Sequence, residues 1–158
     1  MCIRDRMMGE IGNLTTRFGK LTAGGIDIAG DLIVRADLPV DKTDGVETDM
    51  DGISVDGKLV ANAIVNSAAA IDIGGISDLG ADVTAQDGSI SLGTTIVDRV
   101  LLTNDVTLTA SEQISVAGNV EGSSATDLTL DAVDGTTVAG NIGAIFTPVK
   151  DLNVQTGT

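Results

Sequence analysis

The chain has 158 residues, a net charge of −14 and a mean hydropathy of +0.28, and it contains no Trp, Tyr or His. Its acidic surface would repel phosphate groups, which argues against a nucleic-acid partner, and no apolar run is long enough to span a membrane. Cys2 is the single cysteine, so an internal disulfide is excluded.

The first six residues, MCIRDR, resemble a translated sequencing adapter, a leader found on reading frames assembled from metagenomic reads. The alternative is a genuine start with a second initiator at Met7 or Met8. We therefore expect residues 1–6 to be foreign to the fold, residues 7–18 to lead in, and residues 19–158 to form one structural unit.

Short strands are predicted from Lys20 onward, where KLTAGGIDIAGDLIV alternates apolar and polar residues. The loose motif I-x-I-x-G-x-L then recurs along the chain with spacings of 18, 19 and 24 residues, beginning at Ile53, Ile71, Ile90 and Ile114. Because successive strand residues face opposite ways, each copy has one apolar face that a single coil cannot bury. Stacked coils would bury it, so the spacing predicts an all-β solenoid with about 18–24 residues per coil.

The clearest repeat begins at Asp105, where DVTLTASEQISVAGNVEG is followed from Asp127 by DLTLDAVDGTTVAGNIGA and from Asp151 by DLNVQTG. Asp-Gly and Gly-Asn pairs punctuate these copies at places where the chain must turn or where backbones approach closely. A leucine-rich repeat has a similar period, but Ile and Val occupy its Leu positions freely here.

Two stretches depart from this pattern. Residues 59–71, LVANAIVNSAAAI, carry a helical stripe of apolar residues, yet their Ile and Val content and their β neighbours favour strand and corner. Residues 37–56 hold the densest acidic charge, and we expect a loop that protrudes from the solenoid. Within it Glu47, Asp49 and Asp51 place oxygens at alternate positions before Gly52, as a calcium loop does, although Lys58 stands where the bidentate Glu belongs.

The stretches GKLTAGGIDIAGDLIV and DLTLDAVDGTTVAGNI resemble the β-strand repeats of filamentous-haemagglutinin-like adhesins and autotransporter passengers. That resemblance implies a right-handed parallel β-helix in a secreted or surface-displayed bacterial protein. It also implies a structural or adhesive stalk whose projecting loops contact host-surface or matrix glycans or proteins. The family has no fixed ligand motif, so no catalytic or cofactor-binding residue carries over.

An enzyme of the same architecture is the alternative, because β-helices also carry polysaccharide hydrolases and lyases that work with carboxylates. The chain lacks the aromatic platforms and the His, Arg and Lys clusters of a sugar cleft, so we expect no catalytic activity and no cofactor other than, at most, calcium. Thr158 falls within a third copy of the repeat. We therefore expect the same solenoid to continue at both ends, and the isolated piece to associate through open strand edges.

Overall fold

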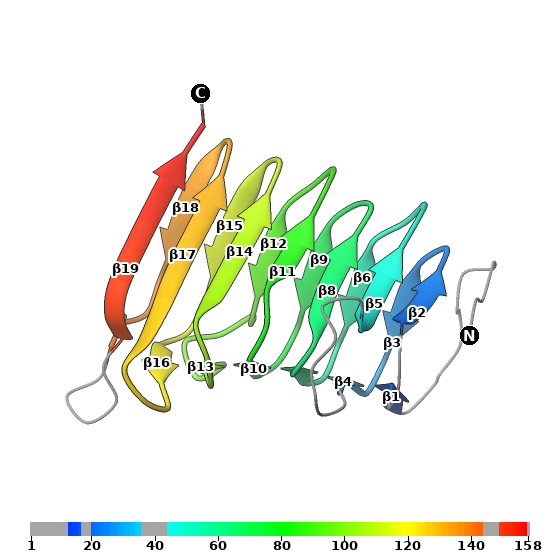
Figure 1. The fold of residues 1–158 in the computed structure, drawn as a ribbon, viewed down its shortest axis with the longest axis horizontal. Helices are drawn as coiled ribbons and strands as arrows, with labels where there is room; N and C mark the ends of the chain where they lie inside the picture. Colours follow the sequence, from blue (N-terminus) through cyan, green and yellow to red (C-terminus); the bar gives the residue numbers. More distant parts are fainter. Residues whose placement is uncertain (1–12, 17–19, 36–43, 144–148, 158) are drawn as a thin grey trace.

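Short strands with alternating apolar residues stack into a β-solenoid in the computed structural model (Figure 1). The structure describes residues 13–16, 20–35, 44–143 and 149–157, and these form strands and turns without a helix. In this part of the chain no helix is therefore long and apolar enough to cross a membrane. The prediction of an all-β solenoid is confirmed.

Three parallel sheets make up the solenoid. Sheet A contains β2 (Lys20–Ala23), β5 (Gly45–Thr48), β8 (Ile64–Ser67), β11 (Val83–Ala85), β14 (Val106–Ala110), β17 (Thr126–Ala132) and β19 (Val149–Thr156). Sheet B contains β3 (Ile26–Ile28), β6 (Ile53–Val55), β9 (Ile71–Ile73), β12 (Ile90–Leu92), β15 (Gln113–Val116) and β18 (Gly135–Val138). Sheet C contains β1 (Asn13–Thr16), β4 (Asp31–Val34), β7 (Leu59–Ala61), β10 (Ser77–Leu79), β13 (Val100–Leu102) and β16 (Val120–Gly122).

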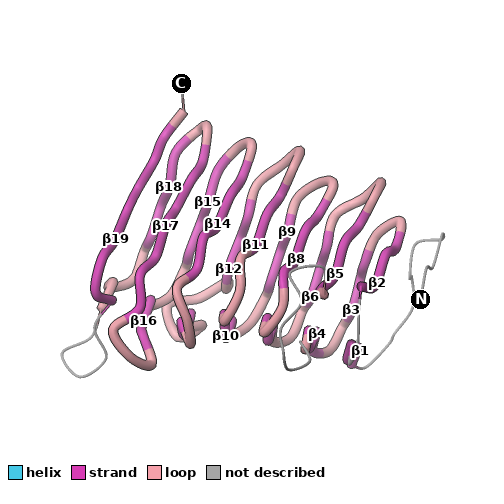
Figure 2. The backbone as a smooth tube through the Cα atoms, viewed as in Figure 1, coloured by secondary structure: helices cyan, strands magenta, loops and turns pink. Residues whose placement is uncertain are grey.

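Each coil visits sheet C, then sheet A, then sheet B, and about six coils follow one another. Figure 2 shows the strands of sheets A and B running side by side and joined at one edge by short turns. Paired residues are 18 positions apart where Ile53 faces Ile71 and 27 apart where Ile26 faces Ile53. The upper limit exceeds the predicted 24 because the second coil carries extra residues between β4 and β5.

The core is a set of aliphatic ladders that run from coil to coil. In sheet B, isoleucines stand at the same inward position of five consecutive coils, all of them buried, at positions 26, 53, 71, 90 and 114. In β14 the side chains of Val106, Leu108 and Ala110 are buried and the threonines between them are partly exposed, as the alternation predicts. Branched aliphatic side chains are large enough to fill this narrow interior without aromatic rings.

A few polar side chains interrupt the ladders. Thr48 and Ser67 occupy neighbouring inward positions of sheet A and hydrogen-bond to each other at 3.0 Å, and the Thr48 hydroxyl also donates to the Asp51 carbonyl at 2.6 Å. Ser77 and Thr126 are equally buried, but their hydroxyl oxygens have no hydrogen-bond partner. The first pair is satisfied, whereas the other two hydroxyls carry a desolvation cost.

The strands of sheet A lengthen toward the C-terminal end. β2, β5 and β8 have 4 residues each and β11 has 3, whereas β14, β17 and β19 have 5, 7 and 8. Figure 1 shows the resulting increase in coil width from the blue end to the red end. The extra length adds one more inward ladder, formed by Val106, Leu128 and Leu152.

The helical stripe at residues 59–71 is not a helix. Those residues form β7, β8 and the start of β9, joined by two corners, so the expectation of strand and corner is confirmed. β-branched residues and close coil-to-coil pairing outweigh the apparent helical spacing.

The acidic stretch is less of a loop than predicted. Residues 45–48 form β5 in the interior of sheet A, and residues 53–55 form β6 in sheet B. Only the corner 49–52 lies between these two strands, and positions 37–43 are outside the described residues. The motif copy that begins at Ile53 predicted β6, whereas the dense charge hid β5, whose inward face consists of Val46 and the polar Thr48.

Candidate functional site

The three calcium candidates are separated by the fold. Glu47 lies on the outer face of β5, where its carboxylate pairs with the Lys20 ammonium of the preceding coil. Asp49 and Asp51 lie at the following corner, and their N–H groups donate to the carbonyls of Ala23 and Gly24. In the described ranges no group of three or more carboxylate, thiol or imidazole side chains is gathered in a way that could hold a metal ion.

Calcium binding at this corner therefore stays a prediction from the sequence. Calorimetric titration with calcium tests it, since even the weak extracellular class of calcium sites binds at about 10⁻⁴–10⁻³ M. A saturable heat that disappears in Asp49→Asn and Asp51→Asn would support the site. No heat at millimolar calcium would remove it.

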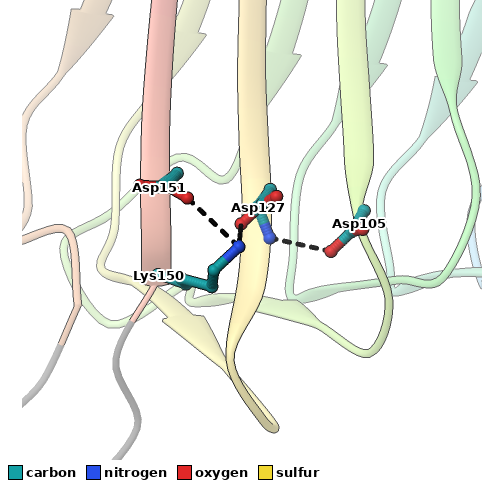
Figure 3. Close-up of polar contacts among 4 residues, drawn as sticks. All are labelled: Asp105, Asp127, Lys150 and Asp151. Atoms are coloured by element: carbon teal, nitrogen blue, oxygen red, sulfur yellow. Dashed lines mark hydrogen bonds and ion pairs between the residues drawn. The ribbon is translucent and has the colours of Figure 1, made fainter.

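A second acidic feature runs along the start of the sheet A strands. Asp105, Asp127 and Asp151 stand on three consecutive coils, and Asp127 faces Asp151 in register (Figure 3). The N–H of Asp127 donates to Oδ1 of Asp105 at 2.9 Å. Lys150 Nζ lies 3.3 Å from Asp127 Oδ1 and 3.2 Å from Asp151 Oδ2. The hydrogen bond to Asp151, and then that to Asp127, raise the pKa of Lys150 above its ordinary value of 10.5.

The Asp105–Asp127 contact is one of a set of side-chain caps that join neighbouring coils. Asx side chains cap the backbone of the next coil at several other places, where an oxygen at position 13, 31, 82 or 119 accepts from the N–H at position 31, 58, 107 or 141, at 2.8–2.9 Å. Parallel strands leave such N–H groups at corners, and a short carboxylate or amide satisfies them. The sequence showed the repeated Asp at the head of each copy, but not its role as an acceptor for the following coil.

Basic residues are used in the same coil-to-coil manner. Of the five basic residues that the structure describes, four pair with a carboxylate on a neighbouring coil: Lys20 with Glu47, Lys58 with Asp78, Arg99 with Glu121, and Lys150 with Asp127. Lys58, the residue that breaks the calcium pattern, is one of them. These four cations form ion pairs between neighbouring coils, so the carboxylates in excess of them face solvent.

One loop projects in an ordered way. Residues 93–99 connect β12 to β13 and are the longest described link between sheets B and C. Oδ2 of Asp98 accepts from the N–H groups of Thr94 and Thr95 at 3.1 and 2.8 Å and from their hydroxyls at 3.3 and 2.8 Å. These bonds, led by the Thr95 hydroxyl, hold the pKa of Asp98 below its ordinary value of 3.8.

The tip of this loop is apolar. Ile96 is 67% exposed and Val97 is 78% exposed, although both belong to the residue types that normally enter the core. The Thr94 hydroxyl also lies 3.2 Å from the Gly74 carbonyl oxygen on the preceding coil, and its single hydrogen is shared between that carbonyl and Asp98. The loop therefore presents two aliphatic side chains on a hydrogen-bonded base. The strand motifs do not mark this loop, and the run TTIVD between two motif copies is the signal that the sequence offers for it.

The outer face of sheet A has one shallow depression of about 220 Å³. Its floor is Gly45, which leaves a gap between Lys20 and Ile64 in the outward row of side chains. Lys20 and Glu47 border it, but they neutralise each other as an ion pair. Among the described residues that line it, the depression therefore offers neither an unpaired cation nor a set of convergent polar groups.

Comparison with protein-family models, with curated proteins and with solved structures finds no match to this chain. The parallel β-solenoid is consistent with β-helical repeat proteins as an architecture.

Proposed function

We propose that this chain is a rod-forming segment of a large secreted or surface-displayed bacterial repeat protein, a structural or adhesive stalk without catalytic activity of its own. The observation that carries the proposal is the uninterrupted core: buried ladders pass through every coil, and neighbouring coils are joined by backbone pairing, Asx caps and ion pairs. A filled interior of this kind serves rigidity and length, because each coil contacts only its neighbours and adds one strand spacing of about 4.8 Å.

The placement outside the cell is part of the same proposal. A solenoid stabilised by ladders needs no disulfide, so the lack of cysteine pairs is compatible with a secreted protein. The test is a long sequencing read across the gene in its source sample. Further copies of the DLTL and VAGN motifs together with a secretion signal would support the proposal. A reading frame that closes without either, and adds a segment rich in His, Tyr and Arg, would favour a β-helical polysaccharide enzyme instead.

In this proposal the adhesive contact belongs to the loop at residues 93–99. An apolar tip on a pre-ordered base loses little conformational entropy on binding, which is the property of an effective contact residue. Binding of the chain to an immobilised extracellular-matrix preparation and to a glycan array would measure it. We expect the double variant Ile96→Ser and Val97→Ser to lower binding at least about tenfold, and the exposed corner variant Met50→Ser to leave it unchanged. Equal loss in both variants would contradict a role for this loop.

Assays of the purified chain with polysaccharides test whether it has catalytic activity. We expect no release of reducing ends or unsaturated uronic acids from a panel of acidic and neutral polysaccharides. Activity that disappears in Asp127→Asn would overturn the proposal, because Asp127 is the carboxylate flanked by two further carboxylates on adjacent coils.

A further inference from the structure

The outer face of sheet C carries a different set of side chains from the outer faces of sheets A and B. Four consecutive coils each place one charged and one aliphatic residue on it, at β4, β7, β10 and β13 (Figure 1). All four aliphatic side chains are partly exposed, and the pairs are Asp31 with Ile33, Lys58 with Val60, Asp78 with Ile76, and Arg99 with Leu101. The outward residues of the neighbouring strands β11, β12 and β14 are all Thr or Ser. Consecutive branched aliphatic residues on the outside therefore mark sheet C among the described strands.

One outward column of this face gives up its backbone caps in the middle. From coil to coil the column contains Asn13, Asp31, Lys58, Ile76, Arg99, Asn119 and Asn141. Side-chain oxygens at positions 13, 31 and 119 accept from the N–H of the next member at 2.8–2.9 Å. Lys58, Ile76 and Arg99 have no side-chain acceptor with which to do the same. Capping of the coils therefore does not explain these three residues, whereas a contact made by the face does.

The charges on this face alternate in sign from coil to coil. Asp31 on β4 is negative, Lys58 at β7 positive, Asp78 on β10 negative and Arg99 at β13 positive. The four charges cancel, although the whole chain has a net charge of −14. Lys58 pairs with Asp78 on the same face. A face without net charge is the side on which a second molecule of the same acidic protein is repelled least.

We propose that this face is a homodimerisation surface, on which two copies of the chain pack sheet C against sheet C with their solenoid axes antiparallel. A twofold axis parallel to the strands places β4 of each copy opposite β13 of the other, and β7 opposite β10. Asp31 then lies opposite Arg99 of the other copy, and Ile33 lies opposite Leu101. Lys58 and Asp78 come from strands that face each other as well. Each charge thus meets the opposite charge on the facing strand, and the outer aliphatic pair is covered by aliphatic side chains.

Other arrangements satisfy fewer of these conditions. Parallel copies set each strand against itself, and antiparallel copies centred on β7 or β10 do the same for that strand, so like charges are opposed. Antiparallel pairing of β10 with β13 and of β7 with β16 opposes unlike charges. It also sets Val60 against Glu121, Ile76 against Arg99 and Leu101 against Asp78. Antiparallel pairing of β4 with β7 matches Ile33 with Val60 but sets Ile76 against the polar Asn13.

Sedimentation equilibrium of the full chain tests the proposal. Four short strands give a small contact of the weak, transient class, so the titration extends to about 1 mM protein at about 0.15 M salt. We expect the mass to rise from 16.0 kDa toward twice that value. Leu101→Lys should lower the association constant at least about tenfold, because it places an ammonium against Ile33 of the other copy. Ser115→Lys adds the same charge to the same coil on the outer face of sheet B and should leave association unchanged.

Cross-linking checks the orientation of the two copies. In a Cys2→Ser background, a mixture of the Ile33→Cys and Leu101→Cys chains should form mixed disulfide dimers under mild oxidation. Either chain alone should not, since its two thiols would be three strand spacings apart, about 14 Å, which is beyond the reach of a disulfide.

Three results would each overturn the proposal. They are a mass of 16.0 kDa at every concentration, an equal loss of association in Leu101→Lys and Ser115→Lys, and cross-linking of Ile33→Cys alone at the rate of the mixture. None of these results bears on the stalk function or on the loop at residues 93–99, because the dimer uses a different face and is independent of both.

Discussion

Single buried hydroxyls are the points where this core is least well matched to its surroundings. Thr126 is 2% exposed, and its Oγ1 has no hydrogen-bond partner. Replacing Thr126 with Val keeps the shape and removes the desolvation cost, so we expect the free energy of unfolding to rise by about 1 kcal/mol. Urea unfolding followed by circular dichroism measures it. The control is Thr107→Val on the outer face of β14, which should change stability by less than about 0.5 kcal/mol; a destabilised Thr126→Val would show that the hydroxyl has a partner in solution.

A glycine can be required by close backbone approach rather than by its own dihedral angles. A Cβ built on Gly118 would lie 1.9 Å from the carbonyl oxygen of Asp98 on the preceding coil, and one on Gly140 would lie 2.3 Å from that of Gly118. Gly118→Ala should therefore lower the free energy of unfolding by about 2–3 kcal/mol, because the coils must move apart. The exposed turn variant Ser123→Ala serves as the control in the same denaturant titration. Equal stability of the two variants would contradict the close packing at Gly118.

The loop at residues 93–99 makes a pH-dependent element. Its base depends on the ionised Asp98, whose pKa lies below 3.8 in the folded chain. Because the pKa is lowered, the ionised Asp98 stabilises the loop at every pH above the ordinary pKa of an Asp side chain. This stabilisation is lost as the pH falls through the pKa that Asp98 has in the folded chain. Amide exchange at Thr94 and Thr95 should therefore stay slow at neutral pH and accelerate, relative to the rest of the chain, below 3.8.

Asp98→Asn separates this effect from general acid unfolding. The amide keeps the size of the side chain but accepts less strongly, so the two threonine amides should exchange faster already at neutral pH while the strands of sheet B remain protected. If exchange in the variant matches that of the parent chain at every pH, the carboxylate does not hold the loop.

At the level of elements, much of this architecture could be predicted from the sequence because the ladders are local patterns. Alternation at Val106, Leu108 and Ala110, and the spacing of the Ile motifs, are enough to predict parallel stacking and its approximate period. β5 was missed since its inward face consists of one aliphatic residue, Val46, and the polar Thr48, among acidic neighbours. The loop tip at Ile96 and Val97 was missed for the opposite reason. Two adjacent aliphatic residues are expected in the core, and only the structure shows that strand residues already fill the core of this coil.

The site residues were harder to predict than the strands. Whether Glu47 is available to a metal depends on Lys20, which is 27 residues away in sequence and one coil away in space. Alternate oxygens in a sequence indicate a calcium loop only if the backbone turns between them, and here the first of the three lies on a flat strand.

The whole molecule carries an excess of negative charge, with a net charge of −14. Because four of the five described cations are already paired between coils, the remaining carboxylates repel one another across the stack. Raising the ionic strength from about 0.01 M to about 0.15 M shortens the screening length from roughly 30 Å to 8 Å. We expect this to add about 1 kcal/mol to stability, or about 2–4 °C in Tm for a chain of this size.

Thermal unfolding followed by circular dichroism measures that shift. The double variant Asp87→Asn and Asp134→Asn removes two exposed charges at corners and should reduce the salt dependence of Tm. A Tm that does not respond to salt in the parent chain would contradict repulsion between coils.

The lengthening of sheet A from β11 to β19 distinguishes the C-terminal coils from one another by strand length. Repeats with equal strands and interchangeable aliphatic rungs could slip by one coil, since a Val or Ile would meet another Val or Ile in the new register. Here a strand of 7 residues at β17 matches its neighbours of 5 and 8 residues far better than the strand of 3 residues at β11. The taper therefore supplies an order that the ladders lack, and a coil that folded in the wrong place would leave part of a longer strand without a partner.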